Sequence, residues 1–366
     1  MHFGLSEEQE LLQETLRGFT ESELPARRLR AVFDEGAGHD EAVWRGLSEM
    51  GIAGLLVPEE YGGAGLEILE LALACEIAGG AALPGALLEH SLVGHAIALG
   101  GSAEQKKRWL PALASGETIG TVALGEQHEA GDAWRPGDWA VLHEGGKLTG
   151  TKSWVPHLGT ASVTLVGTAA GGLAVLEGAP GDVAGTTVEA QEGIDRSRPI
   201  GRLVLDGAEA EPLTRADEDL ASRVLDVGLV GLAADAFGAG TKLIQLSADY
   251  AKDRKQFGWP IAQFQAIKHQ IARMGTDVEP TRALFWYAAH ALDRGLPEAE
   301  RHAAMAKAHV TDRVIGVARQ AVEVHGGLGF TWECDVQMWF KRAMYDRSAL
   351  GTPETLRERM AVQAGW

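Results

Sequence analysis

Arg254 carries a side chain whose geometry suits phosphate groups. It follows a long helical pattern and stands in the stretch "YAKDRKQFG". Its guanidinium offers a planar fork of hydrogen-bond donors that matches a pyrophosphate. A second interpretation makes Arg254 an exposed cation at a helix end, paired with Asp253 or with the helix dipole. The residue and its spacing alone leave both interpretations open.

A glycine cluster further along the chain suggests close approach of a ligand. In "VHGGLGF", Gly326, Gly327 and Gly329 interrupt a stretch that is otherwise helical. Glycine permits positive φ and lets other atoms approach the main chain, because it has no Cβ. A plain helix C-cap needs only one glycine. The cluster therefore favours a ligand-facing surface, with a helix end as the alternative.

The composition limits the classes of protein to consider. The 366 residues are 45% hydrophobic and 23% charged, which fits two or three globular domains. A net charge of −18 argues against an extended nucleic-acid surface. Cys75 and Cys334 offer no disulfide framework and no metal motif, which predicts a cytoplasmic protein without a metal site. No signal peptide or membrane span is recognisable.

The order of patterns along the chain predicts three domains. Helical periodicity extends over 1–118, beginning with a capping box of Ser6 and Gln9. Short β-prone runs fill 119–214, with "EGGK" as a hairpin turn and without the intervening helices that a parallel sheet would require. Long helices return over 215–366. The predicted fold is a multidomain α+β protein: an N-terminal helical domain, a middle β-barrel or sandwich, and a C-terminal four-helix bundle.

Other common functional motifs are absent from the sequence. No Gly-x-Gly-x-x-Gly follows a strand, and "GTKS" lacks the ending of a Walker loop. Neither His-Glu-x-x-His nor Gly-x-Ser-x-Gly occurs. These absences argue against a Rossmann or P-loop nucleotide site and against the commonest zinc and serine hydrolases.

Taken together, the motifs and their order resemble the acyl-CoA dehydrogenase family. In that family a helix ends in Arg-x-x-Phe-Gly, the next opens with Phe-Gln, and a later one ends in Gly-Gly-x-Gly. The resemblance covers essentially the whole length, including "VPEEYGGAGLE" and "GTKSWV". The matching motif residues are Arg254, Phe257, Gly258, Phe264, Gln265, Gly326, Gly327 and Gly329.

The resemblance implies FAD as the cofactor and assigns residues to it. Arg254, Gln256 and Gly327 are expected at its diphosphate and adenosine part, across a subunit interface. Trp154 is expected to pack against the isoalloxazine, with a core aromatic as the alternative interpretation. Thr352 is expected near the adenine. The full set of expected cofactor-binding residues is Trp154, Arg254, Gln256, Phe257, Gln265, Gly326, Gly327, Gly329 and Thr352.

The implied activity is that of an oxidoreductase in lipid metabolism. A flavoprotein of this kind oxidises an acyl-CoA thioester to its trans-2-enoyl form and passes the electrons to an electron-transfer flavoprotein. "HGGLGFTWE" followed by "KRA" is similar to actinobacterial members that act in steroid degradation or on other bulky side chains. Because such members are often built from two related subunits, we expect an oligomer, either a homotetramer or a heterotetramer with a related chain.

The usual catalytic base is missing from this sequence. Family members carry a Glu before the Gly-Thr of the last motif, and here Leu350 takes that place. Other members carry the base on the helix before Arg-x-x-Phe-Gly, where this chain has Gly228. Asp235, among small residues on that helix, is the remaining candidate because a buried carboxylate needs a partner or a function. A polar contact to a neighbouring helix is the equal alternative.

Three smaller departures concern the flavin surroundings. Pro156 replaces a Thr and has no N–H to donate. The segment "GEQHEAGD" replaces the family's Thr-Glu-Pro, and Glu323 replaces a Gln near the expected diphosphate. The sequence thus leaves open a catalytically silent subunit that completes a related chain's FAD site, or an oxidase on the same fold. The acyl group is not specified by these residues.

Overall fold

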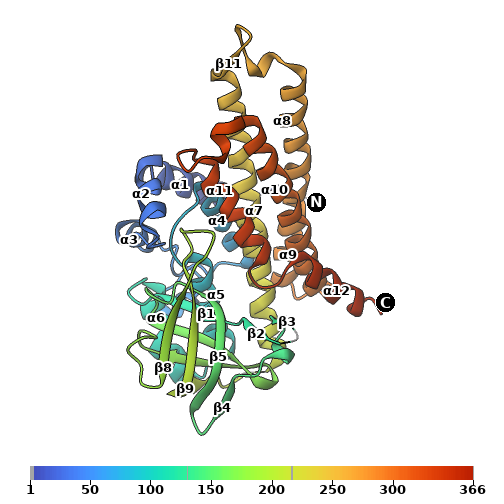
Figure 1. The fold of residues 1–366 in the computed structure, drawn as a ribbon. Coiled ribbons are helices and arrows are strands. Elements are labelled where there is room, and N and C mark those ends of the chain that lie inside the picture. Colours follow the sequence, from blue (N-terminus) through green and yellow to red (C-terminus); the bar gives the residue numbers. More distant parts are fainter. Residues whose placement is uncertain (1–3, 130, 216, 366) are drawn as a thin grey trace. The chain divides into compact units, whose positions relative to one another are not determined.

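The capping box fixes the start of the first helix as predicted. Ser6 Oγ accepts from the Gln9 N–H at 3.2 Å, and Gln9 Oε1 accepts from the Ser6 N–H at 2.9 Å. In the computed structural model, which describes residues 4–129, 131–215 and 217–365, a helical domain, a β domain and a second helical domain follow one another (Figure 1). The predicted fold class is therefore confirmed.

Helices occupy both ends of the chain. Those before the β strands are α1 (Glu7–Glu23), α2 (Ala26–Glu35), α3 (Glu41–Glu49), α4 (Ile68–Ala81), α5 (Leu87–Gly100) and α6 (Ala103–Ala114). Those after the strands are α7 (Glu218–Asp253), α8 (Gln265–Val278), α9 (Arg282–Asp293), α10 (Ala299–His325), α11 (Val336–Ser348) and α12 (Pro353–Gln363). None of the helices among the described residues has the length and apolar character needed to cross a membrane.

The chain forms two compact units that cut across the predicted domain limits. The first unit contains residues up to 31, Ala72–Leu83 and the chain from Leu229 onward. The second contains Val32–Leu71 and Pro84–Gly228. The first unit groups most of α4 with the C-terminal helices because these segments pack on one another. The limits 1–118, 119–214 and 215–366 stay a prediction.

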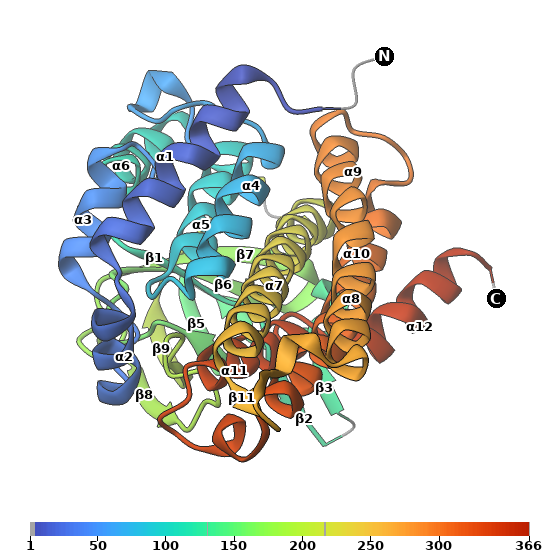
Figure 2. The same ribbon diagram turned by 90° about the horizontal axis from the view of Figure 1, so that it is seen from above.

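Glycines allow a close helix contact in the first unit. A Cβ on Gly79 of α4 would overlap the backbone carbonyl of Asp235 in α7, and a Cβ on Gly238 would overlap that of Glu76. The two helices can touch only because both side chains are absent. Further along the chain, α10 lies beside both α8 and α9 (Figure 2). The small residues around Asp235 thus serve helix packing.

Two four-stranded sheets share one core in the second unit. One has the order β1-β6-β7-β10 and the other β4-β5-β9-β8. Their inner faces contribute Ala123, Leu148, Val166, Leu176 and Leu205 to a single buried cluster, which makes this domain a sandwich. The strands are β1 (Gly120–Ala123), β2 (Glu126–His128), β3 (Gly131–Ala133), β4 (Leu142–Glu144), β5 (Lys147–Pro156), β6 (Val163–Thr168), β7 (Gly172–Glu177), β8 (Thr186–Gln191), β9 (Ile200–Glu209) and β10 (Glu211–Pro212).

The sheet registers confirm one turn and correct one expectation. Gly145 and Gly146, both with positive φ, form the predicted hairpin turn between β4 and β5. The absence of alternating helices argued against a parallel sheet, and the pairings of the sandwich are antiparallel except that β1 pairs with β6 in parallel. The connection between them includes strands β2 to β5 and the short 3-10 helix Pro136–Asp138, so a long crossover satisfies the parallel geometry without an α-helix among its described residues.

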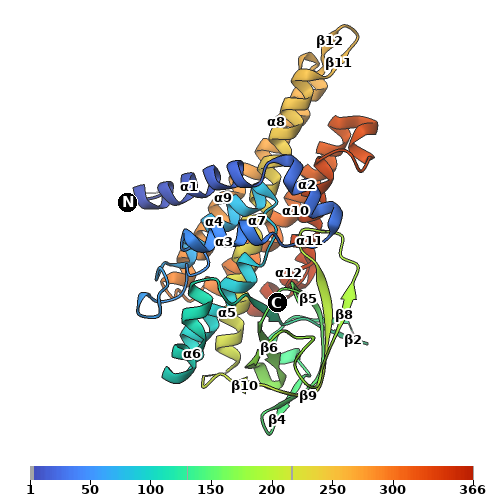
Figure 3. The same ribbon diagram turned by 90° about the vertical axis from the view of Figure 1, so that its left-hand side faces the viewer.

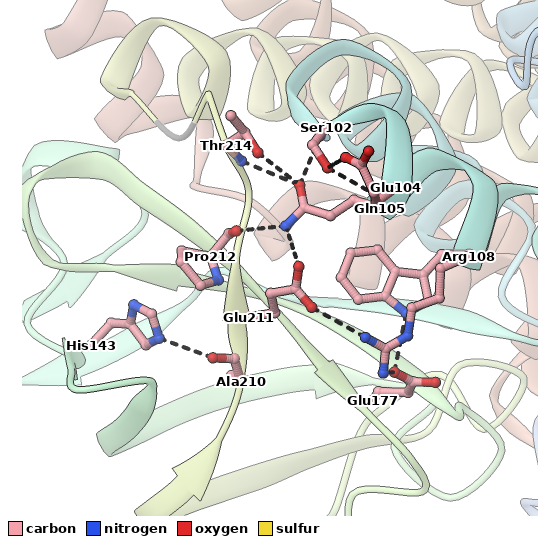
Figure 4. A network of polar contacts seen from close by, with 11 residues as sticks. Ser102, Glu104, Gln105, Arg108, His143, Glu177, Ala210, Glu211, Pro212 and Thr214 are labelled. Carbon is pink, nitrogen blue, oxygen red and sulfur yellow. Dashed lines mark hydrogen bonds and ion pairs between the residues drawn. The ribbon is translucent and has the colours of Figure 1, made fainter.

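Gln105 connects α6 to the edge of the first sheet (Figure 4). The side chain is only 5% exposed. Its Nε2 donates to Glu211 Oε1 and to the Pro212 carbonyl, both at 2.8 Å. Its Oε1 accepts from the N–H of Ser102 at 2.9 Å and from the N–H and hydroxyl of Thr214 at 3.3 and 3.2 Å. Every polar atom of this buried amide therefore has a partner.

Replacing Gln105 by Ala should destabilise the second unit by about 1–3 kcal/mol, because it leaves buried donors and acceptors without partners. Arg108→Ala is the matched control, since Arg108 contacts Glu177 and Glu211 in the same network but has a 55% exposed side chain. Exposed ion pairs contribute about 0–1 kcal/mol. Chemical denaturation of both variants measures the difference, and equal losses would contradict the assignment.

His90 is a neutral imidazole that connects three elements of the second unit. Its Nδ1 accepts from the Gly120 N–H at 3.1 Å, so its Nε2 carries the proton and donates to the Leu113 carbonyl at 3.0 Å. The Trp44 ring meets it edge-on, 5.0 Å between centroids. Burial lowers the pKa of His90 to about 4, despite the favourable bond to Leu113.

This pKa predicts acid sensitivity. This histidine takes up a proton near pH 6.5 in the unfolded chain and only near pH 4 in the folded chain. Its contribution to the free energy of unfolding is therefore fully present above pH 6.5 and is lost as the pH falls to about 4. A His90→Gln variant cannot titrate there. Between pH 7 and 4 the wild type should lose roughly 2–3 kcal/mol more than the variant. Parallel slopes of unfolding free energy against pH would refute the prediction.

Candidate functional site

The Arg254 motif lies at an exposed hairpin tip of the first unit. Helix α7 ends at Asp253, and the chain turns back through the short strands β11 (Lys255–Gln256) and β12 (Trp259–Pro260), as Figure 3 shows at the far end of α7 and α8. Phe257 and Gly258 both have positive φ. A left-handed backbone is costly for a phenylalanine, and Phe257 is also 89% exposed. Its edge-on contact with Phe264, at 6.1 Å between centroids, offsets little of this cost.

Ring stacking brings the hairpin and the glycine motif together. Tyr250 lies one turn before Arg254, and its ring stacks on His325, which directly precedes the glycines, at 4.3 Å and 25°. Nearby, Gln270 Nε2 of α8 donates to Glu323 Oε2 of α10 at 3.0 Å. The ends of α7, α8 and α10 therefore converge. Sequence reasoning missed Tyr250 and His325, although their positions beside the two motifs were a usable signal.

The three glycines have three different roles. Gly326 adopts φ 61° and ψ −141°, a conformation essentially restricted to glycine. A Cβ on Gly327 would meet no atom within 4 Å, so its main chain faces open space. A Cβ on Gly329 would lie 2.5 Å from the Val322 carbonyl, so this glycine is required by the turn itself. Because Gly329 serves internal packing, the expected ligand-facing surface includes Gly326 and Gly327 but not Gly329.

The exposed groups here suit a diphosphate. Within the described residues, Arg254 forms no ion pair with Asp253 or any other carboxylate, so its guanidinium remains available. The Gln256 side chain donates to its neighbour, the Lys255 carbonyl, and Gln265 opens α8 with an exposed side chain. A planar cation, two amides and an open glycine backbone form a donor set that fits a dinucleotide.

Thr352 and Leu350 lie in a turn whose backbone carbonyls bind a buried lysine. Lys307 Nζ donates to the Arg347 carbonyl at 2.8 Å and also to the Gly351 carbonyl. Burial lowers the pKa of Lys307 to about 7. Leu350 has φ 55° and is 9% exposed, and the Thr352 hydroxyl caps α12 by accepting from the Thr355 N–H. The turn is therefore built from backbone contacts, and Leu350 offers no group that takes up a proton.

Asp235 is fully buried and bound to an arginine of α11. Arg342 Nε donates to its Oδ1 at 2.8 Å and Arg342 Nη2 to its Oδ2 at 2.7 Å, while Nη1 donates to the Leu83 carbonyl. Both side chains are about 1% exposed. A carboxylate with both oxygens in a bidentate pair is a structural anchor. These contacts favour the polar-contact interpretation of Asp235 over the catalytic-base interpretation.

In the second unit, Trp154 occupies a strained position of β5. Its φ is 54°, and the ladder with β9 shifts register between Lys152 and Val155. The Trp154 N–H donates to Gln191 Oε1 at 3.1 Å. The indole is only half-buried, and it lies outside the hydrophobic core of the sandwich. This placement favours a functional contact over the core-aromatic interpretation.

The segment "GEQHEAGD", which departs from the family pattern, contributes Glu126 to buried contacts within the second unit. Glu126 of β2 accepts from Lys152 Nζ at 2.6 Å and from the N–H groups of Ala140 and Val141. Burial opposes ionisation of Glu126, but the Lys152 charge and the hydrogen bonds outweigh it and lower its pKa. Burial lowers the pKa of Lys152 to about 8. The carbonyl of Pro156 accepts from the Thr121 hydroxyl.

Comparison with known proteins identifies the family. The model of the acyl-CoA dehydrogenase N-terminal domain matches residues 6–117, and that of the C-terminal domain matches 219–365. The chain is 30% identical to acyl-CoA dehydrogenase IpdE2 of Mycolicibacterium smegmatis, over 98% of this chain and 99% of that protein. This chain belongs to the acyl-CoA dehydrogenase family.

Solved structures agree with this assignment. A variant of the steroid ACAD Tcur3481-Tcur3483 superposes with a TM-score of 0.89, at 31% identity over 98% of both chains. The ChsE4-ChsE5 complex from Mycobacterium tuberculosis superposes with a TM-score of 0.88, at 27% identity over 100% of this chain and 99% of that one. The predicted likeness to steroid-type acyl-CoA dehydrogenases of actinobacteria is confirmed.

The Asp235 pair yields a stability prediction. Asp235→Asn or Arg342→Met should each cost about 3–5 kcal/mol, because each leaves one buried charge without its partner. The double variant Asp235→Asn with Arg342→Met removes both charges and should cost less than the sum of the single changes. Denaturant unfolding of the three variants measures this coupling. Additive losses would show that the pair is not the main contact of either residue.

Proposed function

We propose that this acyl-CoA dehydrogenase family member binds FAD and introduces an α,β double bond into an acyl-CoA thioester, as a subunit of an oligomer. The observation that carries the proposal is the exposed tip that presents Arg254, Gln256 and Phe257 beside the open main chain of Gly327. Within the described residues, Arg254 forms no ion pair, and the side-chain contacts of Gln256 and Phe257 are confined to the adjoining Lys255 and Phe264. Exposure of a strained phenylalanine and an unpaired arginine is readily explained when another molecule covers them.

Each expected site residue then has a defined task. The Arg254 fork would hold the diphosphate, and Gln256 and Gln265 would donate to neighbouring polar groups of the cofactor. Thr352 would lie near the adenine, and Trp154 of the second unit would offer its indole face to the isoalloxazine. Bound FAD would supply the acceptor for the hydride from the β-carbon. The electrons would then pass to an electron-transfer flavoprotein.

An oligomer is supported by apolar side chains that remain in solvent. Phe330 is 78% exposed and Trp259 is 58% exposed, while Leu328 and Trp332 are exposed to a lesser degree. All four flank the glycine motif or the hairpin tip in the sequence. Exposed apolar groups of this size mark interaction surfaces. These exposed side chains support the proposal that a second subunit covers the site.

The identity of the second subunit bears on the catalytic base. Leu350 cannot accept a proton, and both oxygens of Asp235 accept from Arg342. Two of the similar structures carry the names of two components, Tcur3481-Tcur3483 and ChsE4-ChsE5. We therefore favour assembly with a related chain that provides the α-proton acceptor. A homotetramer would require a base that neither Leu350 nor Asp235 supplies.

Measurement of bound flavin tests the proposal. The full chain is purified alone and together with a related chain, and flavin absorbance per protomer is recorded. Arg254→Ala should weaken FAD binding by about ten- to hundredfold, the equivalent of one charge-assisted contact. Arg301→Ala is the matched control, because Arg301 is an exposed arginine near the start of α10, at the opposite end of that helix from Gly326.

The outcomes separate the competing functions. FAD lost in Arg254→Ala and kept in Arg301→Ala supports the proposed site. Equal binding by both variants would refute it. Flavin that appears only in the mixed assembly, with no acyl-CoA-dependent bleaching at this chain's own site, would instead identify a catalytically silent subunit.

A further inference from the structure

A second tryptophan lies against Trp154. Trp134 directly follows β3, and its ring stacks on that of Trp154 with 5.4 Å between centroids and 28° between planes. Both side chains are half-buried, and neither belongs to the hydrophobic core of the sandwich. Offset stacking of this kind is a favourable aromatic geometry. Burial in the core therefore does not account for the presence of Trp134.

The main chain is shaped to allow this stack. The register of β2 with β3 pairs Glu126 with Ala133, which places Gly125 opposite Trp134. A Cβ on Gly125 would lie 2.7 Å from the Trp134 ring and 3.0 Å from the Ser153 carbonyl. The Gly125 carbonyl accepts from the Ser153 N–H at 2.9 Å. Glycine at 125 thus lets the Trp134 ring lie directly on the strand that carries Trp154.

Trp154 needs such support because its backbone is strained. A positive φ is rare for a bulky residue and persists only where its surroundings impose it. Three features impose this conformation on Trp154: the register shift in β5, the hydrogen bond from its N–H to Gln191, and the stacked Trp134 ring. The first two fix the backbone of Trp154. Of these three features, the stack is the one that involves the indole itself and restricts its rotation.

We propose that Trp134 is a positioning residue that holds the Trp154 indole in the orientation in which it meets the flavin ring. The inference rests on the proposed function, since Trp154 acts on the flavin only if FAD is bound. Trp134 need not touch the cofactor. It restricts the rotamers of Trp154 and thereby lowers the entropy that this indole loses when a ligand packs against it.

The first test uses the full chain without added cofactor. Two stacked indoles give an exciton couplet in circular dichroism, and Trp134→Ala should remove it. Gly125→Ala, which pushes the Trp134 ring away, should weaken it while both tryptophans remain. Trp286→Phe is the control, because it removes a partly buried indole of α9 that lies outside the pair. A couplet unchanged in Trp134→Ala would overturn the proposal.

The second test measures the effect on bound flavin. Trp134→Ala should weaken FAD binding by roughly two- to tenfold, the range of one aromatic pair, and should alter the flavin absorption band. Trp134→Phe keeps an aromatic ring and should restore most of both. The couplet lost with flavin binding and absorption unchanged would overturn the positioning role while leaving the proposed function intact. A wild type that binds no FAD in any assembly would overturn the proposed function, and the positioning role with it.

Discussion

The first unit depends on the contact between α4 and α7, where a glycine of each helix lies directly against the backbone of the other. Gly79 and Gly238 make this distance possible. The same contact buries Asp235, whose charge must then be neutralised inside the protein. Arg342 meets that need and also donates to the carbonyl of Leu83, so one guanidinium connects α7, α11 and the segment that follows α4. The position of α11 in turn determines where the Leu350 turn and α12 begin.

Buried charges elsewhere in the chain follow the same logic. Lys152 is paired with Glu126, and Lys307 is bound to two backbone carbonyls. Each of these groups has a perturbed pKa, a property that also marks catalytic residues. Here their partners are strands, turns and helix ends of the same unit. A perturbed pKa in this chain therefore indicates structural neutralisation as readily as chemistry.

Local signals in the sequence predicted local structure well. The Ser6 capping box and the Gly145–Gly146 turn need only neighbouring residues, and both are present. The parallel pairing of β1 with β6 was not predictable, because it joins strands that are far apart in the chain. The partner of Asp235 was hidden for the same reason, since Arg342 lies 107 positions away. The distinct roles of Gly326, Gly327 and Gly329 could be assigned only from their backbone angles and neighbouring atoms, which the sequence does not provide.

The exposed α7–α8 tip has a consequence for how the protein matures. Under the proposed function, a cofactor shared between this tip and a second chain would bind the assembled form more tightly than the separate chains. By mass action, ligand binding and subunit association then strengthen each other to the same extent. Flavin supply and protein concentration would act as two interchangeable controls on assembly. The strained backbone of Phe257 would then be a free-energy cost that the isolated chain bears in order to hold the tip in the conformation that a second subunit binds.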